Sequence, residues 1–263
     1  AIASRLGHRV VRGQSRFAFV SGNRFEQRLK QDGGHRLFEA LAPLVSLPGS
    51  PQMLDVNAGI SEPKAGLQLG ARVRATEAVL LRIARGEKGT PALLDHPLLE
   101  YEFAGGSAFV EPDALVLRPD GRIEVVEIKS YAIVDGQADP DKLASTAGQA
   151  AVYALALRQT LVRLGLQEDL VPWSVILVAP MNFGRTAVAH RVPLEKKAAA
   201  IKRVLRSIPN LSDVLQALPE GFTLDLDPEG HLTPESKKAK LQEAVALLEK
   251  NYVAQADRER GRF

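Results

Sequence analysis

Apolar residues gather in short continuous runs in the middle of the chain, and these runs predict β-strands. Val, Ile and Leu dominate residues 114–117, 123–128 and 174–178, while residues 98–103 and 186–192 also have strand character. A short apolar run bounded by turn residues is typical of a strand that is covered on both faces. We therefore expect a sheet buried between helices, with residues 98–103 as its first strand.

Apolar residues three and four positions apart predict helices on both sides of these runs. The predicted helices cover residues 21–29, 35–45, 69–85, 139–165, 195–208, 212–218 and 234–256. The helix after Asp139 is the best defined, because Asp139 can cap it, Pro140 suits its first turn and Gly165 suits its end. A strand, a helix and a strand in this order imply a parallel pair with a right-handed crossover. The predicted fold is α/β, with a central mixed β-sheet flanked by helices and a helical C-terminal extension.

A turn signal separates the runs at 114–117 and 123–128. Pro119, Asp120 and Gly121 suit a type I turn that is closed by a glycine with positive φ, as in a three-residue hairpin loop. That loop pairs Arg118 with Arg122, so the numbers of residues directly opposite one another sum to 240. The sequence thus predicts both a hairpin and its register.

The register places charged residues together at the open end of the hairpin. Asp113 faces Glu127, and Lys129 lies on the same side because side chains alternate along a strand. Two carboxylates directly opposite each other are normally destabilising, but a divalent cation between them removes this repulsion. Mg²⁺ accepts one or two carboxylates and takes further ligands from water and phosphate. The hairpin therefore predicts a metal-dependent phosphodiesterase site.

Pro112-Asp113 followed by Glu127-Ile128-Lys129 resembles the signature of the PD-(D/E)xK nuclease superfamily. Gln149 and Tyr153 match the Gln-x-x-x-Tyr of its RecB-like branch, and residues 22–26 resemble the Gly-x-x-x-(His or Glu) helix of that branch. The similarity covers roughly residues 15–192. It implies a restriction-endonuclease-like core, without the iron–sulfur cluster of some relatives, because the chain has no cysteine.

The resemblance also implies roles for individual residues. Asp113, Glu127, Lys129 and Gln149 are the expected catalytic residues, and the expected metal ligands are Glu26, Asp113, Glu127 and Ile128. Glu77 is the alternative to Glu26 as the upstream acidic ligand. The residues expected to contact nucleic acid are Arg16, Arg24, Arg28, Lys142 and Tyr153.

Charge and composition fit this interpretation. The formal net charge is +3, with 45% hydrophobic and 25% charged residues, and residues 1–30 hold seven Arg and Lys against Glu26. A basic segment of this kind suits a phosphate backbone. We expect a basic arm at 1–14, a nuclease-like core at 15–192 and a helical extension at 193–263. No apolar run is long enough to cross a bilayer, so we expect a soluble, cytoplasmic protein.

The expected function is a Mg²⁺-dependent DNA nuclease, with Mn²⁺ as a substitute, in which a metal-activated water attacks the phosphodiester. DNA repair, recombination and defence against foreign DNA are the expected settings. The expected partners are single- or double-stranded DNA and a helicase or another subunit of a larger complex. Two alternatives stay open: the same chemistry on RNA, and a nucleic-acid-binding subunit with little catalytic activity.

Overall fold

The structure is a computed structural model. It describes residues 16–58, 60, 65–87, 89–208, 210, 213, 216, 231, 233, 235–236, 239–244 and 246. The chain divides into two compact units, Gln14–Ile208 and a second unit formed by Ala1–Gly13 with Pro209–Phe263. The predicted arm at 1–14 lies wholly outside the described residues, and so do most residues of the predicted helices at 212–218 and 234–256. The described residues between 235 and 246 are helical, with Ala244 buried.

A mixed sheet of six strands forms the centre of the first unit, as predicted. The strand order is β1-β2-β5-β6-β7-β8. The strands are β1 (Met53–Asp55), β2 (Leu93–Asp95), β5 (Ala114–Leu117), β6 (Ile123–Ile128), β7 (Ser174–Pro180) and β8 (Ala187–Pro193). The pairs β1–β2 and β6–β7 are parallel, and the other neighbours are antiparallel. The predicted parallel pairing of residues 123–128 with 174–178 is therefore confirmed.

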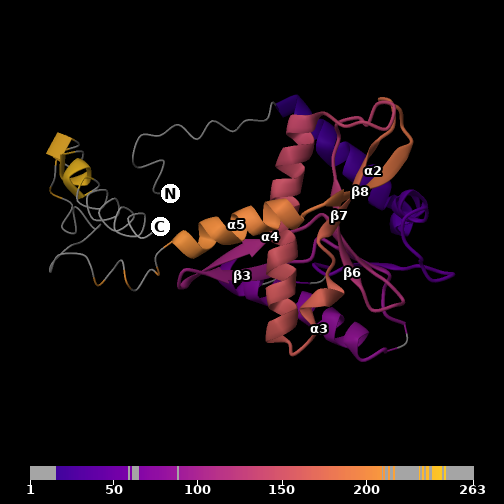
Figure 1. Cartoon of the computed structure of the whole chain (residues 1–263), viewed down its shortest axis with the longest axis horizontal. Helices are drawn as coiled ribbons and strands as arrows, with labels where there is room; N and C mark the ends of the chain where they lie inside the picture. Colours follow the sequence, from indigo (N-terminus) through magenta and orange to yellow (C-terminus); the bar gives the residue numbers. More distant parts are fainter. Residues whose placement is uncertain are drawn as a thin grey trace. The chain divides into compact units, whose positions relative to one another are not determined.

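Helices flank this sheet. They are α2 (Arg16–Leu41), α3 (Ala65–Ala84), α4 (Pro140–Arg163) and α5 (Glu195–Ser207), with a short 3₁₀ helix at Glu168–Leu170. Figure 1 shows α5 crossing α4, against which it packs. Within α2 the backbone leaves the helical conformation at residues 31–34, so α2 consists of two helical segments joined by a kink. Among the described residues, no helix combines the length and the apolar character that a membrane span needs.

The two faces of the sheet carry two separate hydrophobic cores. Leu115, Leu117 and Val125 pack with α3, α4 and α5 on one face. Val116 and Val126 point to the opposite face and pack with the buried side of α2. Every residue of β5 and β6 is buried, which explains why apolar residues occupy both faces of these strands; the exceptions are Glu124 and Glu127 of β6, which are buried as well.

Residues 98–103 do form a strand, but the prediction that it is the first strand of the central sheet is wrong. β3 (Leu99–Phe103) pairs with β4 (Gly106–Val110) in a separate two-stranded sheet. Glu100 and Glu102 alternate with its apolar residues, as in a strand with one covered face. The central sheet instead begins with β1 and β2, which have three residues each and are too short for a periodic pattern.

The ends of α4 follow the sequence prediction. Asp139 Oδ1 accepts hydrogen bonds from the backbone N–H groups of Asp141 and Lys142, at 3.1 and 3.0 Å. Pro140 opens the helix, where a missing N–H costs nothing. Gly165 follows the last turn with φ +75°. The small side chains at Ala147, Ala150 and Ala154 let the helix approach the sheet closely.

The predicted hairpin register is confirmed. Leu117 lies opposite Ile123 and Ala114 lies opposite Val126, so the residue numbers of each pair sum to 240. Arg118 N–H donates to Arg122 O at 2.9 Å, and Gly121 N–H donates to Arg118 O at 3.0 Å. Gly121 has φ +82°, as the turn type requires.

Replacing Gly121 tests how far the turn controls the hairpin. A β-carbon at position 121 would meet no heavy atom within 4 Å, so any penalty comes from the backbone conformation alone. We expect Gly121→Val to destabilise the protein by about 2 kcal/mol, because a branched residue disfavours positive φ, and Gly121→Asn to cost clearly less. Urea unfolding of both variants measures this difference. Equal losses for Val and Asn would contradict the role given to the turn.

Candidate active site

Asp113 and Glu127 converge at the end of the β5–β6 hairpin. Asp113 precedes β5 and its Oδ2 accepts a hydrogen bond from Ile128 N–H at 2.7 Å. Lys129 Nζ lies 2.5 Å from Glu127 Oε2 and 3.9 Å from Asp113 Oδ2. Because one ammonium contacts both carboxylates, all three side chains lie on the same side of the hairpin, as the register predicted.

Glu127 is the most unusual residue of this group. Its side chain is fully buried, and among the described residues neither of its carboxylate oxygens has a hydrogen bond of good geometry, although Lys129 contacts one of them. Burial is the main cause that raises the pKa of Glu127, and the nearby charge of Asp113 adds to it, so that this pKa lies at about 8. A buried carboxylate with unused acceptor sites is costly unless a cation or a donor compensates it.

Burial and neighbouring charges also shift the pKa values of Asp113 and Lys129. Burial raises the pKa of Asp113, while the ammonium of Lys129 and the N–H of Ile128 oppose the increase. Burial lowers the pKa of Lys129, but the carboxylates of Glu127 and Asp113 outweigh it, so the pKa of Lys129 lies above its ordinary value. Lys129 is thus a charged hydrogen-bond donor at neutral pH in the metal-free protein.

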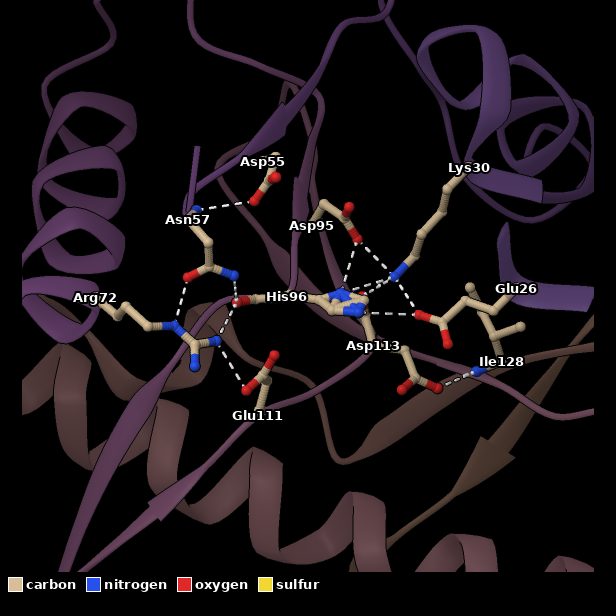
Figure 2. Close-up of polar contacts among 10 residues, drawn as sticks. All are labelled: Glu26, Lys30, Asp55, Asn57, Arg72, Asp95, His96, Glu111, Asp113 and Ile128. Carbon is tan, nitrogen blue, oxygen red and sulfur yellow. Dashed lines mark hydrogen bonds and ion pairs between the residues drawn. The ribbon is translucent and has the colours of Figure 1, made fainter. Parts of the chain in front are cut away.

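A second lysine lies beside this group. Figure 2 shows Lys30 of α2 pointing between Glu26, Asp95 and His96. The Lys30 ammonium contacts Glu26 Oε1, lies 2.5 Å from Asp95 Oδ1 and donates to the carbonyl oxygen of Asp113 at 2.8 Å. Lys30 thus contacts both Glu26 and Asp113. The charge of Glu26 raises the pKa of both Asp113 and Glu127.

The ring of His96 lies between Lys30 and Glu26. Lys30 Nζ lies 3.1 Å from His96 Nδ1, and His96 Nε2 lies 3.3 Å from Glu26 Oε1. His96 Nδ1 also lies 3.2 Å from Asp95 Oδ1, so this nitrogen faces both a donor, the Lys30 ammonium, and an acceptor, the Asp95 carboxylate. The His96 carbonyl accepts from Asn57 Nδ2 at 3.2 Å and from Arg72 Nη2 at 3.4 Å.

The backbone of His96 has φ +47°, which is uncommon for a residue other than glycine. Such conformations persist where the surroundings enforce them and are concentrated at functional sites. Arg72 helps to enforce it here, because its guanidinium also donates to Asn57 Oδ1 at 2.5 Å and pairs with Glu111 at 2.8 Å (Figure 2). Lys30, Asp95 and His96 were missed by the sequence analysis. The apolar pair Leu93-Leu94 directly before Asp95 was the only local signal.

Gln149 and Tyr153 lie together on α4, as their spacing predicted. Gln149 Nε2 donates to the Tyr153 hydroxyl at 2.6 Å. Tyr153 is buried in the core, and burial, together with the charge of Glu127, raises its pKa to about 12. Among the described residues, Gln149 thus hydrogen-bonds Tyr153 and not the carboxylates of Asp113 and Glu127. The expected contact of Tyr153 with nucleic acid is not compatible with its burial in this conformation.

The two candidates for the upstream acidic ligand lie in different places. Glu77 Oε1 pairs with Arg163 Nη2 at 2.5 Å, in the last turn of α4. Arg163 is fourteen residues beyond Gln149, which is about 20 Å along a helix. Glu26 instead shares Lys30 with Asp113. The structure thus brings Glu26, and not Glu77, to the acidic pair.

The residues expected to bind nucleic acid are spread over two helices. Arg24 is exposed on α2, and Arg28 lines a cleft beside α2. Lys142 is exposed on the first turn of α4, with its ammonium 5.9 Å from the centre of the Tyr131 ring. Arg16 begins α2, and its side chain lies outside the described residues.

The charges of the site leave room for a cation. Lys30 and Lys129 face four carboxylates, those of Glu26, Asp95, Asp113 and Glu127, so two negative charges remain when all are ionised. Mg²⁺ needs only one or two carboxylates and keeps several waters, which suits the Asp113–Glu127 pair. In the described part of the chain, no three His, Asp or Glu side chains are spaced as a complete set of metal ligands. The ammonium groups of the two lysines lie among the carboxylates instead.

Comparison of the chain with protein-family models and with curated proteins found no match.

Proposed function

We propose that this protein is a Mg²⁺-dependent nuclease with a PD-(D/E)xK core. The observation that carries the proposal is the convergence of Asp113 and Glu127 on Lys129, with both oxygens of Glu127 buried and lacking hydrogen bonds of good geometry. This agrees with the Pro-Asp and Glu-x-Lys motifs of the sequence and with the register that joins them. The proposed site of action is the cytoplasm, and the proposed substrate is DNA.

Asp113 and Glu127 are the residues that would hold Mg²⁺ through their carboxylates. Ile128, between Glu127 and Lys129, would contribute its backbone carbonyl, the only group of this residue that can bind a metal. Bound there, Mg²⁺ would activate water and stabilise the charge that develops on the phosphate. Lys129, a charged donor in contact with Glu127, would orient a phosphate oxygen or the attacking water. Gln149 and Tyr153 would fix the buried side of the site through their hydrogen bond.

A cleavage assay tests the proposal. Supercoiled, linear and single-stranded DNA, together with RNA, are incubated with the protein in EDTA, Mg²⁺ or Mn²⁺. We expect cleavage of DNA with either metal and none in EDTA. Intact substrates in both metals would contradict the proposal, and cleavage of RNA alone would favour the alternative substrate.

The lack of a complete set of metal ligands among the described residues favours a second function, a nucleic-acid-binding subunit that does not cleave. In that function Lys30 and Lys129 are permanent partners of the carboxylates. Binding of DNA in EDTA without cleavage in Mg²⁺ would support it. Cleavage that depends on Asp113 would exclude it.

Metal titration distinguishes the two candidates for the upstream acidic residue. We expect Glu26→Gln to raise the Mg²⁺ concentration needed for half-maximal cleavage by about tenfold, the effect of losing a group that supports metal ligands. Glu77→Gln is the matched control and should behave as wild type, because Glu77 pairs with Arg163. A raised metal requirement in Glu77→Gln alone would reverse the assignment.

A further inference from the structure

The turn between β7 and β8 carries an aromatic residue in an unfavourable conformation. Asn182 and Phe183 both have positive φ, +46° and +59°, and Gly184 N–H donates to Met181 O at 2.7 Å. A bulky residue with positive φ is a rare outlier, and hairpin turns usually place glycine there. The Phe183 side chain is 82% exposed, so it gains almost no burial in return. Folding alone therefore does not explain phenylalanine at this position.

Hydrogen bonds hold the turn in place. Asn182 N–H donates to Ile133 O at 2.9 Å, and Asn182 Oδ1 accepts from Asp135 N–H at 3.0 Å. These bonds tie the turn to the segment that follows Lys129. Phe183 is thus displayed on an ordered support.

The turn lies at the same edge of the sheet as the acidic pair. β6 and β7 are parallel, and Lys129 N–H donates to Val178 O at 2.9 Å. Glu127 and Lys129 lie at the carboxyl end of β6, and the turn follows the carboxyl end of β7. A ligand that crosses this edge can therefore reach both Phe183 and the acidic pair.

Phe183 borders a depression of about 700 Å³ on one side of the turn. Its lining includes Tyr131 and Lys142, together with Asp135 and Asp139. Asp139 is engaged in capping α4. Aromatic rings beside a lysine are typical of surfaces that stack nucleobases near a phosphate.

An arginine cleft lies on the α2 side of the turn, with a volume of about 610 Å³, and is defined by Arg28, Arg36 and Arg185. Arg28 and Arg36 lie on the two segments of α2 that flank its kink, and Arg185 lies two residues beyond Phe183. None of the three has an ion pair with any residue that the structure describes. Glu39 is the acidic residue of the lining, and its Oε1 lies 3.5 Å from His35 Nδ1, so the three arginines outnumber the acidic side chains of the lining. Three arginines that line one concavity and have no ion pair among the described residues favour an anionic ligand with several phosphates.

We propose that single-stranded DNA crosses the β7–β8 turn, with a base stacked on Phe183 and backbone phosphates in the arginine cleft. This inference rests on the proposed nuclease function and specifies its substrate. A free aromatic face needs an unpaired base, because both faces of a base inside a duplex are already stacked. The strand is then led along the sheet edge toward Asp113 and Glu127.

Binding in EDTA tests this inference independently of cleavage, because it needs no metal. The probes are a labelled oligothymidylate, an abasic strand of the same length and the thymidylate strand in duplex with oligoadenylate. We expect Phe183→Gly to bind oligothymidylate about tenfold more weakly, the size of one stacking contact, and to bind the abasic strand as wild type does. Its melting temperature should equal or exceed that of wild type, since glycine suits the turn. Phe183→Trp, which keeps a stacking face, should retain the affinity.

The arginine cleft is tested with Arg28→Gln, Arg36→Gln and Arg185→Gln combined. We expect weaker binding of both single strands and a salt dependence of log affinity that is shallower by about 0.7 for each arginine lost. Arg203→Gln, an exposed arginine of α5, is the matched control and should not change binding.

The inference would be overturned by wild-type affinity in Phe183→Gly, by an equal loss for the abasic strand in that variant, or by tighter binding of the duplex. Tighter binding of oligouridylate than of oligothymidylate would assign the strand to RNA and reject DNA. If the protein binds these strands but does not cleave them in Mg²⁺, the proposed nuclease function is contradicted and the proposed binding surface is not.

Discussion

Glu127→Gln is expected to abolish Mg²⁺-dependent cleavage and to stabilise the metal-free protein at high pH. The loss of activity should be at least about a hundredfold, the effect of removing a single group that acts on the transition state. Asp113→Asn and Lys129→Ala should lose activity to a similar extent, because the three side chains form one group. Asp120→Asn, an exposed acidic residue of the same hairpin, is the control and should cleave as wild type.

The gain in stability follows from the direction of the pKa shift. The pKa of Glu127 is about 8 in the folded protein, above its ordinary value of 4.5. The folded protein therefore holds the proton of Glu127 more tightly than the unfolded chain does. The stabilisation that this proton supplies is fully present below the pKa of Glu127 in the unfolded chain, and it is lost as the pH rises through the pKa of Glu127 in the folded protein. Glutamine stays neutral, so Glu127→Gln should match wild type at about pH 5 and exceed it in unfolding free energy at about pH 9, in EDTA.

Added Mg²⁺ supplies a further measurement. It should raise the melting temperature of the wild-type protein and leave that of Glu127→Gln unchanged, because a ligand stabilises only the protein that binds it. Wild-type cleavage rates in all three site variants would show that the acidic pair is not the active site. If the unfolding free energy of Glu127→Gln falls at high pH as much as that of wild type, Glu127 is not the buried acid that causes the loss of stability.

Glu124→Ala is expected to have the largest effect on stability. Glu124 is fully buried on β6, and its oxygens accept from Arg118 Nη1 at 2.9 Å and from the guanidinium of Arg191. Arg191 also donates to Leu44 O at 3.2 Å, so Glu124 connects the hairpin and β8 to the turn that follows α2. Removing one partner of a buried ionic cluster leaves the other charges uncompensated. We expect the unfolding free energy to fall by about 3 kcal/mol.

Urea unfolding at neutral pH measures this loss. Glu39→Ala removes an exposed glutamate and is the matched control, with an expected change within about 0.5 kcal/mol. Below its melting temperature, Glu124→Ala should still cleave, because neighbouring residues alternate faces and Glu124 points away from the side that carries Glu127. A stability equal to that of Glu39→Ala would contradict the role given to the buried cluster.

The alternation of side chains along a strand also explains why the sequence predicted one part of the site, formed by Asp113, Glu127 and Lys129. The loop at Pro119-Asp120-Gly121 fixes the register, and the register carries Asp113, Glu127 and Lys129 to one side. These steps depend on φ angles and on pairing within one hairpin, which are local properties. The caps of α4 and the Gln149–Tyr153 hydrogen bond were predictable for the same reason.

The other half of the site depends on contacts between distant segments. Lys30 lies 65 residues before Asp95 and 83 before Asp113, and no local pattern relates these positions. β2 has only three residues, so its pairing with β5, rather than any periodicity, brings Asp95 and His96 beside Asp113. The choice between Glu26 and Glu77 likewise follows from where α2 and α3 pack.

The sequence by itself determined the hairpin, its register, the convergence of Asp113 and Glu127 and the boundaries of α4, because each follows from short-range geometry. Only the tertiary structure decided that Lys30, Asp95 and His96 join them, that residues 98–103 leave the central sheet, and that Phe183 and the arginine cleft lie at the same sheet edge. Those outcomes depend on which hydrophobic faces bury one another, and that choice is made by the whole core rather than by any segment.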